Sequence, residues 1–303
     1  MSEPCGILIV NKPCGITSHD VVGRVRRLFG TRRVGHTGTL DPLASGVLVV
    51  LVGRAAKAAE YLVSDEKGYR ATMRLGLTSD TEDITGTLTE STATLPSPDR
   101  VIEAARSFVG EILQIPPMYS ALKVDGQKLY DLARRGITVE REARPVTIHA
   151  LTVTPTDTPT DYLLDVTCSA GTYIRTLCAD LGQALGCGAV MATLERTLAG
   201  GFGLSDAHTL EELEAMSEDA RRAALLETES LFATLPAVHL PAFYERLYRS
   251  GCEIYQKKIG THLEIGTRVR VCNADGKFFA LGEVREYEDG TAIKSLKMFD
   301  LEG

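Results

Sequence analysis

The 303-residue chain lacks the short motifs that mark most cofactor and metal enzymes. It has no G-x-x-x-x-G-K-[ST] loop, no G-x-S-x-G elbow and no H-E-x-x-H pair, and no G-x-G-x-x-G follows a strand-like run. Its six histidines are scattered and show no metal-ligand spacing. We therefore expect neither a nucleotide cofactor nor a catalytic metal.

Disulfide patterns and membrane signals are also missing. The seven cysteines are odd in number and form no C-x-x-C, which argues against a disulfide framework and a zinc ribbon. No apolar run approaches the ~20 residues of a membrane span. The run Gly6–Val10 is shorter than the roughly 7–15 apolar residues of a signal-peptide core. With 44% hydrophobic and 24% charged residues, we expect a soluble, globular, cytoplasmic protein.

Charge is unevenly distributed along the chain. The net charge of the whole chain is −7, yet residues 1–75 carry +5 and residues 120–150 carry +2. Residues 76–119 carry −5 and residues 206–239 carry −6. A polyanion would therefore bind the first segment, and the two acidic segments should lie away from it.

The alternation of patterns predicts an α+β fold in two domains. Strand-like runs cover 6–10, 47–52, 69–75, 146–153 and 163–168, and helix-like runs cover 18–29 (with Ser18 as N-cap), 98–109, a segment from about 172, and 209–226. From residue 238 the chain has short β-rich runs, broken by Asp275-Gly276 and Asp289-Gly290, which are typical hairpin turns. We expect a domain over 1–237 and a small β-barrel over 238–303.

The segment RRVGHTGTLDPLASG, residues 32–46, is the densest candidate site. Its glycines let the backbone turn tightly or approach a ligand. Asp41 could serve chemistry, or it could cap a short helix over 42–45, because Asp before Pro is a common helix start. The other polar side chains could equally be a structural histidine and two solvated arginines: His36, Arg32 and Arg33.

Two further segments place polar groups where they could bind a ligand. In SAGTYIRT, residues 169–176, Arg175 falls in the first turn of a predicted helix, where a cation costs roughly 0.3–1 kcal/mol. A carboxylate or phosphate nearby would compensate it, or it reaches solvent. In KGYRATMRL, residues 67–75, apolar and cationic positions alternate, so Tyr69 is either a core residue or a base-stacking tyrosine.

Five blocks of the sequence together resemble one family. They are GILIVNKPCGITSHDVV, RRVGHTGTLDPLASGVL, KGYRATMRLGLTSDTEDITG, QIPPMYSALKVDGQKLYDLARRG and CSAGTYIRTLCADLG, and they occur in the order found in bacterial tRNA pseudouridine synthases of the TruB type. The match covers roughly residues 6–200. The β-rich tail is similar to the PUA-like RNA-binding module of such enzymes. The resemblance implies a pseudouridine-synthase fold, a mixed sheet flanked by helices.

The resemblance also implies a reaction and a set of site residues. The enzyme would isomerise uridine 55 in the T-loop of tRNA to pseudouridine after flipping the base out. Asp41 falls on the catalytic aspartate, Tyr69 on the tyrosine that packs on the base, and Arg175 on the arginine that pairs with the aspartate. Substrate contacts would come from Lys12 (with Pro13), Arg32, Arg33, His36, Tyr173 and Leu194. Glu195 stands where relatives more often have arginine, so no RNA contact is assigned to it.

The residues leave several questions open. Asp41 could attack C1′ or C6, or remove the 2′ proton, and Arg175 would keep a buried carboxylate ionised from about 4–6 Å. Rival functions are a non-catalytic tRNA-binding protein, a guide-RNA-dependent synthase, and a nucleoside hydrolase. Guide-dependent enzymes tend to have basic tails, whereas this chain ends in MFDLEG, so we expect no guide RNA. With no exposed coiled-coil pattern, we expect a monomer.

Overall fold

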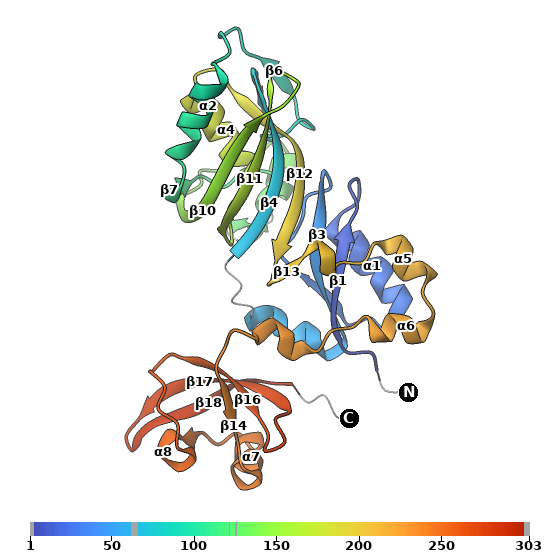
Figure 1. Ribbon diagram of the computed structural model, residues 1–303, viewed down its shortest axis with the longest axis vertical. Coiled ribbons are helices and arrows are strands. Elements are labelled where there is room, and N and C mark those ends of the chain that lie inside the picture. Colours follow the sequence, from blue (N-terminus) through green and yellow to red (C-terminus); the bar gives the residue numbers. More distant parts are fainter. Residues whose placement is uncertain (1–2, 62–65, 121, 125, 300–303) are drawn as a thin grey trace.

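One large mixed sheet forms the centre of the computed structural model, which describes residues 3–61, 66–120, 122–124 and 126–299 (Figure 1). Neighbouring strands are antiparallel except for β3 and β12, which run parallel. The strands in spatial order are β1 (Gly6–Lys12), β3 (Ala44–Val52), β12 (Ala189–Ala199), β4 (Glu66–Leu75), β11 (Asp161–Ser169), β10 (Arg144–Pro155) and β7 (Gly110–Gln114).

Helices cover the two halves of this sheet separately. Helix α1 (Ser18–Phe29) and helix α5 (Leu210–Ala215) pack on the β1–β3 half, and their apolar side chains form one core cluster. Helix α2 (Pro98–Arg106) and helix α4 (Ile174–Ala184) pack on the other half and form a second cluster. Figure 1 shows these two halves side by side. The predicted α+β class with a helix-flanked mixed sheet is confirmed.

The two halves meet where β3 and β12 pair in parallel over three residues. This pairing requires glycine at position 46. Gly46 has φ +103°, and a Cβ there would lie 2.2 Å from the carbonyl oxygen of Arg196. The close approach brings the loop that precedes β3 against β12.

The predicted strands are confirmed, but some helix ends differ. Helix α1 is capped by Thr17, not Ser18, because the side chains of Thr17 and Asp20 form a reciprocal capping box. Helix α2 ends at Arg106, before the expected residue 109. The expected helix over 209–226 is two helices, α5 and α6 (Glu218–Ala223), because Ser217 caps the second one after an extended residue.

Shorter elements connect these parts. Two short strands pair with the main sheet, two hairpins and one helix lie in the connections, and three segments form 3-10 helices. They are β2 (Val34–Thr37), β13 (Phe202–Gly203), β5 (Leu77–Ser79), β6 (Leu88–Glu90), β8 (Lys123–Val124), β9 (Gln127–Lys128), α3 (Leu129–Arg134), η1 (Gly53–Tyr61), η2 (Leu204–Asp206) and η3 (Thr228–Phe232).

The C-terminal part forms a second, five-stranded sheet curved into a PUA-like half-barrel (Figure 1). Its β16–β17 and β17–β18 pairs are antiparallel hairpins closed at the two predicted Asp-Gly turns. Its elements are β14 (Ala237–His239), β16 (Arg268–Cys272), β17 (Phe278–Tyr287), β18 (Gly290–Met298), β15 (Ile254–Tyr255), α7 (Ala242–Arg249) and α8 (Gln256–Ile259).

An apolar contact joins this part to the rest of the chain. The ring centroid of Phe232 in η3 lies 6.0 Å from the ring centroids of both Phe278 and Phe299. Arg270 also forms an ion pair of 2.7 Å with Glu229. All seven cysteines are free thiols, as expected. Within the described residues, no helix is long and apolar enough to cross a membrane.

Candidate active site

Asp41 lies in a turn at the junction of the two half-sheets. The helix that Asp41 could have capped is absent: residues 42–43 form a turn, the amide of Ala44 donates to the carbonyl of Asp41 (3.0 Å), and β3 begins there. The amide of Gly15 donates to the carbonyl of Pro42 (2.7 Å) and ties the turn to the loop after β1. The helix-cap interpretation is therefore wrong, and the carboxylate is available for another partner.

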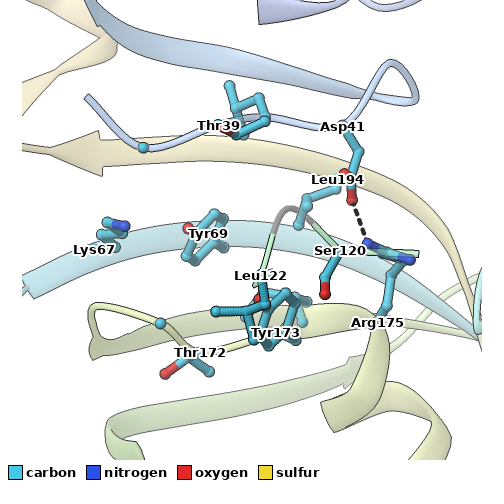
Figure 2. A pocket seen from close by; sticks show the side chains of 14 residues that line it. Thr39, Asp41, Lys67, Tyr69, Ser120, Leu122, Thr172, Tyr173, Arg175 and Leu194 are labelled. Atoms are coloured by element: carbon cyan, nitrogen blue, oxygen red, sulfur yellow. Dashed lines mark ion pairs between the residues drawn. The ribbon is translucent and has the colours of Figure 1, made fainter. Parts of the chain in front are cut away.

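That partner is Arg175, near the start of α4. Its Nη2 lies 3.0 Å from Oδ2 of Asp41 (Figure 2). The arginine side chain is only 5% exposed, whereas the aspartate side chain is 38% exposed. We expected a buried carboxylate held by a cation; in the free protein the arginine is the buried partner and the carboxylate faces the cavity.

Arg175 is also held by the segment after β5 and by Tyr119, which follows β7. Its Nη1 donates to the carbonyl of Thr81 (3.1 Å), its Nη2 donates to the carbonyl of Tyr119 (2.8 Å), and Asp83 Oδ2 lies 4.0 Å from its Nε. These contacts satisfy a cation that the helix dipole alone would disfavour. The guanidinium is thereby fixed before any substrate binds.

The segment that carries Asp83 is strained. Glu82 has φ +63°, a left-handed conformation that non-glycine residues rarely adopt. Its carboxylate accepts a bond of 2.6 Å from the hydroxyl of Thr176, and burial raises the pKa of Glu82. Part of the acidic segment 76–119, which we expect to lie away from the RNA, therefore supports Arg175 from inside the fold, because a buried arginine needs anionic and carbonyl partners at close range.

The Asp41–Arg175 pair borders a cavity of about 300 Å³ (Figure 2). The cavity lies where the 38–41 loop, β4, β12 and the start of α4 converge. Five predicted site residues line it: Asp41, Tyr69, Tyr173, Arg175 and Leu194. It also has lining side chains that the sequence analysis did not single out: Thr39, Lys67, Ser120, Leu122 and Thr172.

Tyr69 combines both of its predicted roles. Its side chain is 8% exposed and belongs to the core cluster, yet the ring forms part of the cavity wall. Burial raises the pKa of Tyr69, which keeps the phenol neutral. The alternation along β4 is confirmed, because Arg70 and Arg74 lie on the other face and pair with Asp165 and Asp161.

Two buried cations support the loop that carries Asp41. Lys12 is fully buried and donates to the carbonyls of Pro13 and Ile16 (2.9 and 2.8 Å); burial lowers its pKa to about 8. Arg196 in β12 is 1% exposed and donates to the carbonyls of Val47 and Gly38 (2.7 and 2.9 Å). Arg196 thereby fixes the backbone on both sides of the Asp41 turn, and Lys12 fixes the loop after β1 that contacts this turn through Gly15.

A buried glutamine positions Tyr173. Gln114, 1% exposed at the end of β7, accepts a bond from the amide of Tyr173 (3.0 Å) and donates to its carbonyl (3.2 Å). Tyr173 is the N-cap residue of α4, two residues before Arg175. The glutamine side chain therefore supplies the cap interactions that this helix start lacks from its own side chain.

Replacing Gln114 by leucine is expected to lower the free energy of unfolding by about 1–3 kcal/mol, because the amide of Tyr173 loses its acceptor and its carbonyl loses one of two donors. Pseudouridine formation should also slow, because Tyr173 and Arg175 lose their fixed positions. Denaturant unfolding and single-turnover rates measure both effects. Gln183→Leu on the exposed side of α4 is the matched control. A Gln114 variant with the stability of that control would contradict the positioning role.

Four predicted site residues do not line the cavity. One is Lys12, which is fully buried and binds backbone carbonyls; the other three are His36, Arg32 and Arg33. His36 in β2 is partly buried, its Nδ1 has no hydrogen-bond partner, and burial lowers its pKa. Arg33 pairs with Glu3 (3.1 Å), as part of the surface. Arg32 and Arg33 border a separate hollow of about 500 Å³ with Lys57. If these three side chains contact a substrate, they would therefore contact parts of the substrate that lie outside the cavity.

Sequence reasoning missed Arg196, Gln114 and Asp83. Arg196 had a usable signal, since strand alternation puts it on the same face as the apolar Leu194 and Leu198. Gln114 begins one of the five blocks, but a single amide in a strand carries no sign of burial. Asp83 had no local signal, because its partner is 92 positions away in the sequence.

This fold and cavity define the class of the protein. The chain has the pseudouridine-synthase fold, and two solved structures superpose on nearly all of it. A Cbf5–Nop10–Gar1 complex matches with a TM-score of 0.75 and 27% identity, covering 97% of this chain and 84% of that one. An H/ACA ribonucleoprotein bound to a substrate RNA containing 2′-deoxyuridine matches with a TM-score of 0.73 and 25% identity, with the same coverage.

The chain belongs to the TruB family of pseudouridylate synthases. Residues 26–174 match the N-terminal domain of that family and residues 175–233 match the tRNA pseudouridylate synthase B C-terminal domain. It is 43% identical to tRNA pseudouridine synthase B of Burkholderia mallei over 93% of both chains. It is 42% identical to tRNA pseudouridine synthase B of Alkaliphilus oremlandii over 97% of this chain and 98% of the relative. The protein is an isomerase.

Proposed function

We propose that this protein converts uridine 55 in the T-loop of tRNA to pseudouridine. The observation that carries the proposal is the carboxylate of Asp41, held 3.0 Å from a buried arginine at a cavity with a tyrosine in its wall. At about 300 Å³ the cavity is at the small end of ligand pockets, a size for one nucleoside rather than a folded loop. The target base must therefore leave its stack and enter alone.

Base flipping needs a surface to replace the lost stacking. Extruding a stacked base costs a few kcal/mol, and an aromatic side chain recovers part of it. Tyr69 is the aromatic side chain of the β4 wall, and Leu194 and Tyr173 supply further apolar surface. A filled cavity also excludes water, so that the detached uracil recombines with the sugar rather than being lost by hydrolysis.

The reaction conserves all atoms of the nucleoside. The N1–C1′ bond breaks, the uracil turns, the C5–C1′ bond forms, and the C5 proton leaves while N1 gains one. Asp41 supplies the one carboxylate, acting at C1′, at C6 or on the 2′ proton. Arg175 holds this carboxylate ionised and oriented, because an adjacent cation favours the charged form.

The rest of the chain would bind the RNA around this site. We assign substrate contacts to His36, Tyr173 and Leu194, and phosphate contacts to Arg32 and Arg33. Lys12, which is fully buried, supports the neighbouring loop and does not reach the substrate. The unit over 238–303 is an RNA-binding domain attached to a catalytic domain over 1–237. The protein acts as a monomer in the cytoplasm, without a guide RNA.

A guide-dependent synthase is the alternative with a specific observation behind it. Both superposed structures are ribonucleoprotein or multiprotein complexes by their descriptions, but their identity to this chain is 25–27%. Identity to the bacterial proteins named tRNA pseudouridine synthase B is 42–43%. Purified protein and a tRNA transcript alone, with pseudouridine mapped by mass spectrometry, test the proposal. We expect pseudouridine at position 55 and none in a transcript with cytidine there; conversion elsewhere, or only with added RNA, would overturn it.

A quadruple alanine variant tests the basic first segment. Each phosphate contact contributes about −0.7 to −0.9 to the slope of log affinity against log salt. We expect replacement of Arg24, Arg27, Arg32 and Arg33 to make that slope less steep by up to about 3, measured by filter binding of tRNA. Ion pairs of Arg24 with Glu214 and of Arg33 with Glu3 reduce the effect. An unchanged slope would remove this surface from the RNA footprint.

A further inference from the structure

Lys67 is a cation of the cavity to which neither the reaction nor the sequence motifs assign a role. It lies on β4 two residues before Tyr69, so that the two side chains share one face of the strand. Figure 2 shows Lys67 on the far side of Tyr69 from the Asp41–Arg175 pair. Its side chain lines the cavity and is partly exposed, which places the ammonium group at the rim.

Lys67 has no anionic partner among the described residues of the free protein. Within the parts of the chain that the structure describes, no hydrogen bond or ion pair engages its Nζ, in contrast to Lys12 and Arg175. Burial lowers the pKa of Lys67, and the neighbouring Arg196 lowers it further. A half-buried cation beside a second cation is costly unless an anion joins it in the working state.

The surrounding backbone keeps this place open. Gly38 has φ +71°, and a Cβ at Gly38 would lie 3.4 Å from Nζ of Lys67 and 3.4 Å from Nη1 of Arg196. The guanidinium of Arg196 is directed to the carbonyls of Gly38, Thr39 and Val47, so it stays in place as a fixed charge. Lys67 is thus the cation with free donors at this end of the cavity.

We propose that Lys67 binds a phosphate of the RNA backbone directly next to the nucleotide whose base enters the cavity. Only the base and sugar of a flipped nucleotide fit inside, so its flanking phosphates come to the rim, where the ammonium group lies. An ammonium ion is a point charge with three donors, which suits a phosphate oxygen. The contact forms only when a nucleotide is flipped, and Lys67 thereby stabilises the flipped state.

A cycle of protein and RNA changes tests this proposal, which rests on the proposed function. T-stem-loop RNA is made with one uncharged methylphosphonate linkage, either 5′ or 3′ of uridine 55, and tested with wild type, Lys67→Met and Lys67→Arg. We expect Lys67→Met to lose about tenfold to a hundredfold in affinity and in kcat/KM with natural RNA. One of the two methylphosphonates should lower the affinity and kcat/KM of the wild type by a similar factor. The same methylphosphonate should cause no further loss in Lys67→Met. Lys67→Arg should stay within a few-fold of wild type.

Arg70→Met is the matched control, because it removes one positive charge from the same strand on the opposite face. It should respond to both methylphosphonates as the wild type does.

Lys67→Met should unfold at the same denaturant concentration as the wild type or at a higher one, since it removes an unpaired cation. A lower midpoint would indicate a structural role for Lys67 instead. If each methylphosphonate lowers the affinity of Lys67→Met by the same factor as that of the wild type, the proposed phosphate contact is wrong. RNA that binds without conversion would refute the proposed function alone, because the coupling is still read from the affinities. Absence of RNA binding would refute both.

Discussion

Asp41→Asn is expected to slow pseudouridine formation by about 10⁴-fold or more in single-turnover assays. Asparagine has the shape of aspartate but cannot act as a nucleophile or base, and no other carboxylate lines the cavity within the described residues. RNA affinity should change by no more than a few-fold, because the aspartate side chain is exposed at the rim and the cavity keeps its shape.

A second aspartate provides the control for this experiment. Asp165 also pairs with an arginine, Arg70 (2.9 Å), but on the opposite face of the sheet. Asp165→Asn should therefore leave the rate unchanged. If Asp41→Asn keeps more than about a hundredth of wild-type turnover, the carboxylate is not the reacting group, and the proposed chemistry is wrong.

Arg175→Met is expected to lose both activity and stability. The arginine is buried, and its removal leaves Asp83, itself 8% exposed, without its cation. Breaking a buried pair in this way costs roughly 3–5 kcal/mol. Turnover should fall by a factor comparable to that of Asp41→Asn, because the carboxylate loses its oriented partner. Urea unfolding and single-turnover rates measure the two losses.

The double variant Arg175→Met/Asp83→Asn separates the two effects. Replacing the carboxylate of Asp83, which no longer has its cation, should recover part of the lost stability. A neutral amide is less costly to bury than an unpaired charge. Activity should not recover, because Asp41 still lacks its cation. A double variant that regains turnover would show that Arg175 acts only through folding.

Five strands of the main sheet were predictable from sequence, because each shows a long apolar or alternating run; β7 and β12 were not predicted. The β-rich pattern after residue 238 also matches strands and was predictable. The break in the expected helix over 209–226 was not predictable, because its apolar spacing continues through Met216. The helix ends there because Ser217 caps a second helix. Local capping decided an element that periodicity alone described as continuous.

The site was predictable only in part. Local motifs pointed to Asp41, Tyr69 and Arg175, and the structure brings all three to one cavity. The partners that orient them are not local. Gln114 reaches Tyr173 across 59 positions and Arg196 reaches Gly38 across 158, so only the folded sheet reveals them. Asp41 itself was ambiguous in sequence, because a cap and a reacting carboxylate share the same Asp-Pro pattern.

The central claim is that this cavity joins C5 of uracil to C1′ without releasing the base. T-stem-loop RNA carrying tritium at C5 of uridine 55 tests it directly, with tritium in water and free uracil measured on the same samples. The account predicts that wild type releases tritium stoichiometrically, that no uracil appears, and that Asp41→Asn releases neither. Free uracil would contradict it in favour of a hydrolase, and tight binding with no tritium release would contradict it in favour of a protein that only binds tRNA.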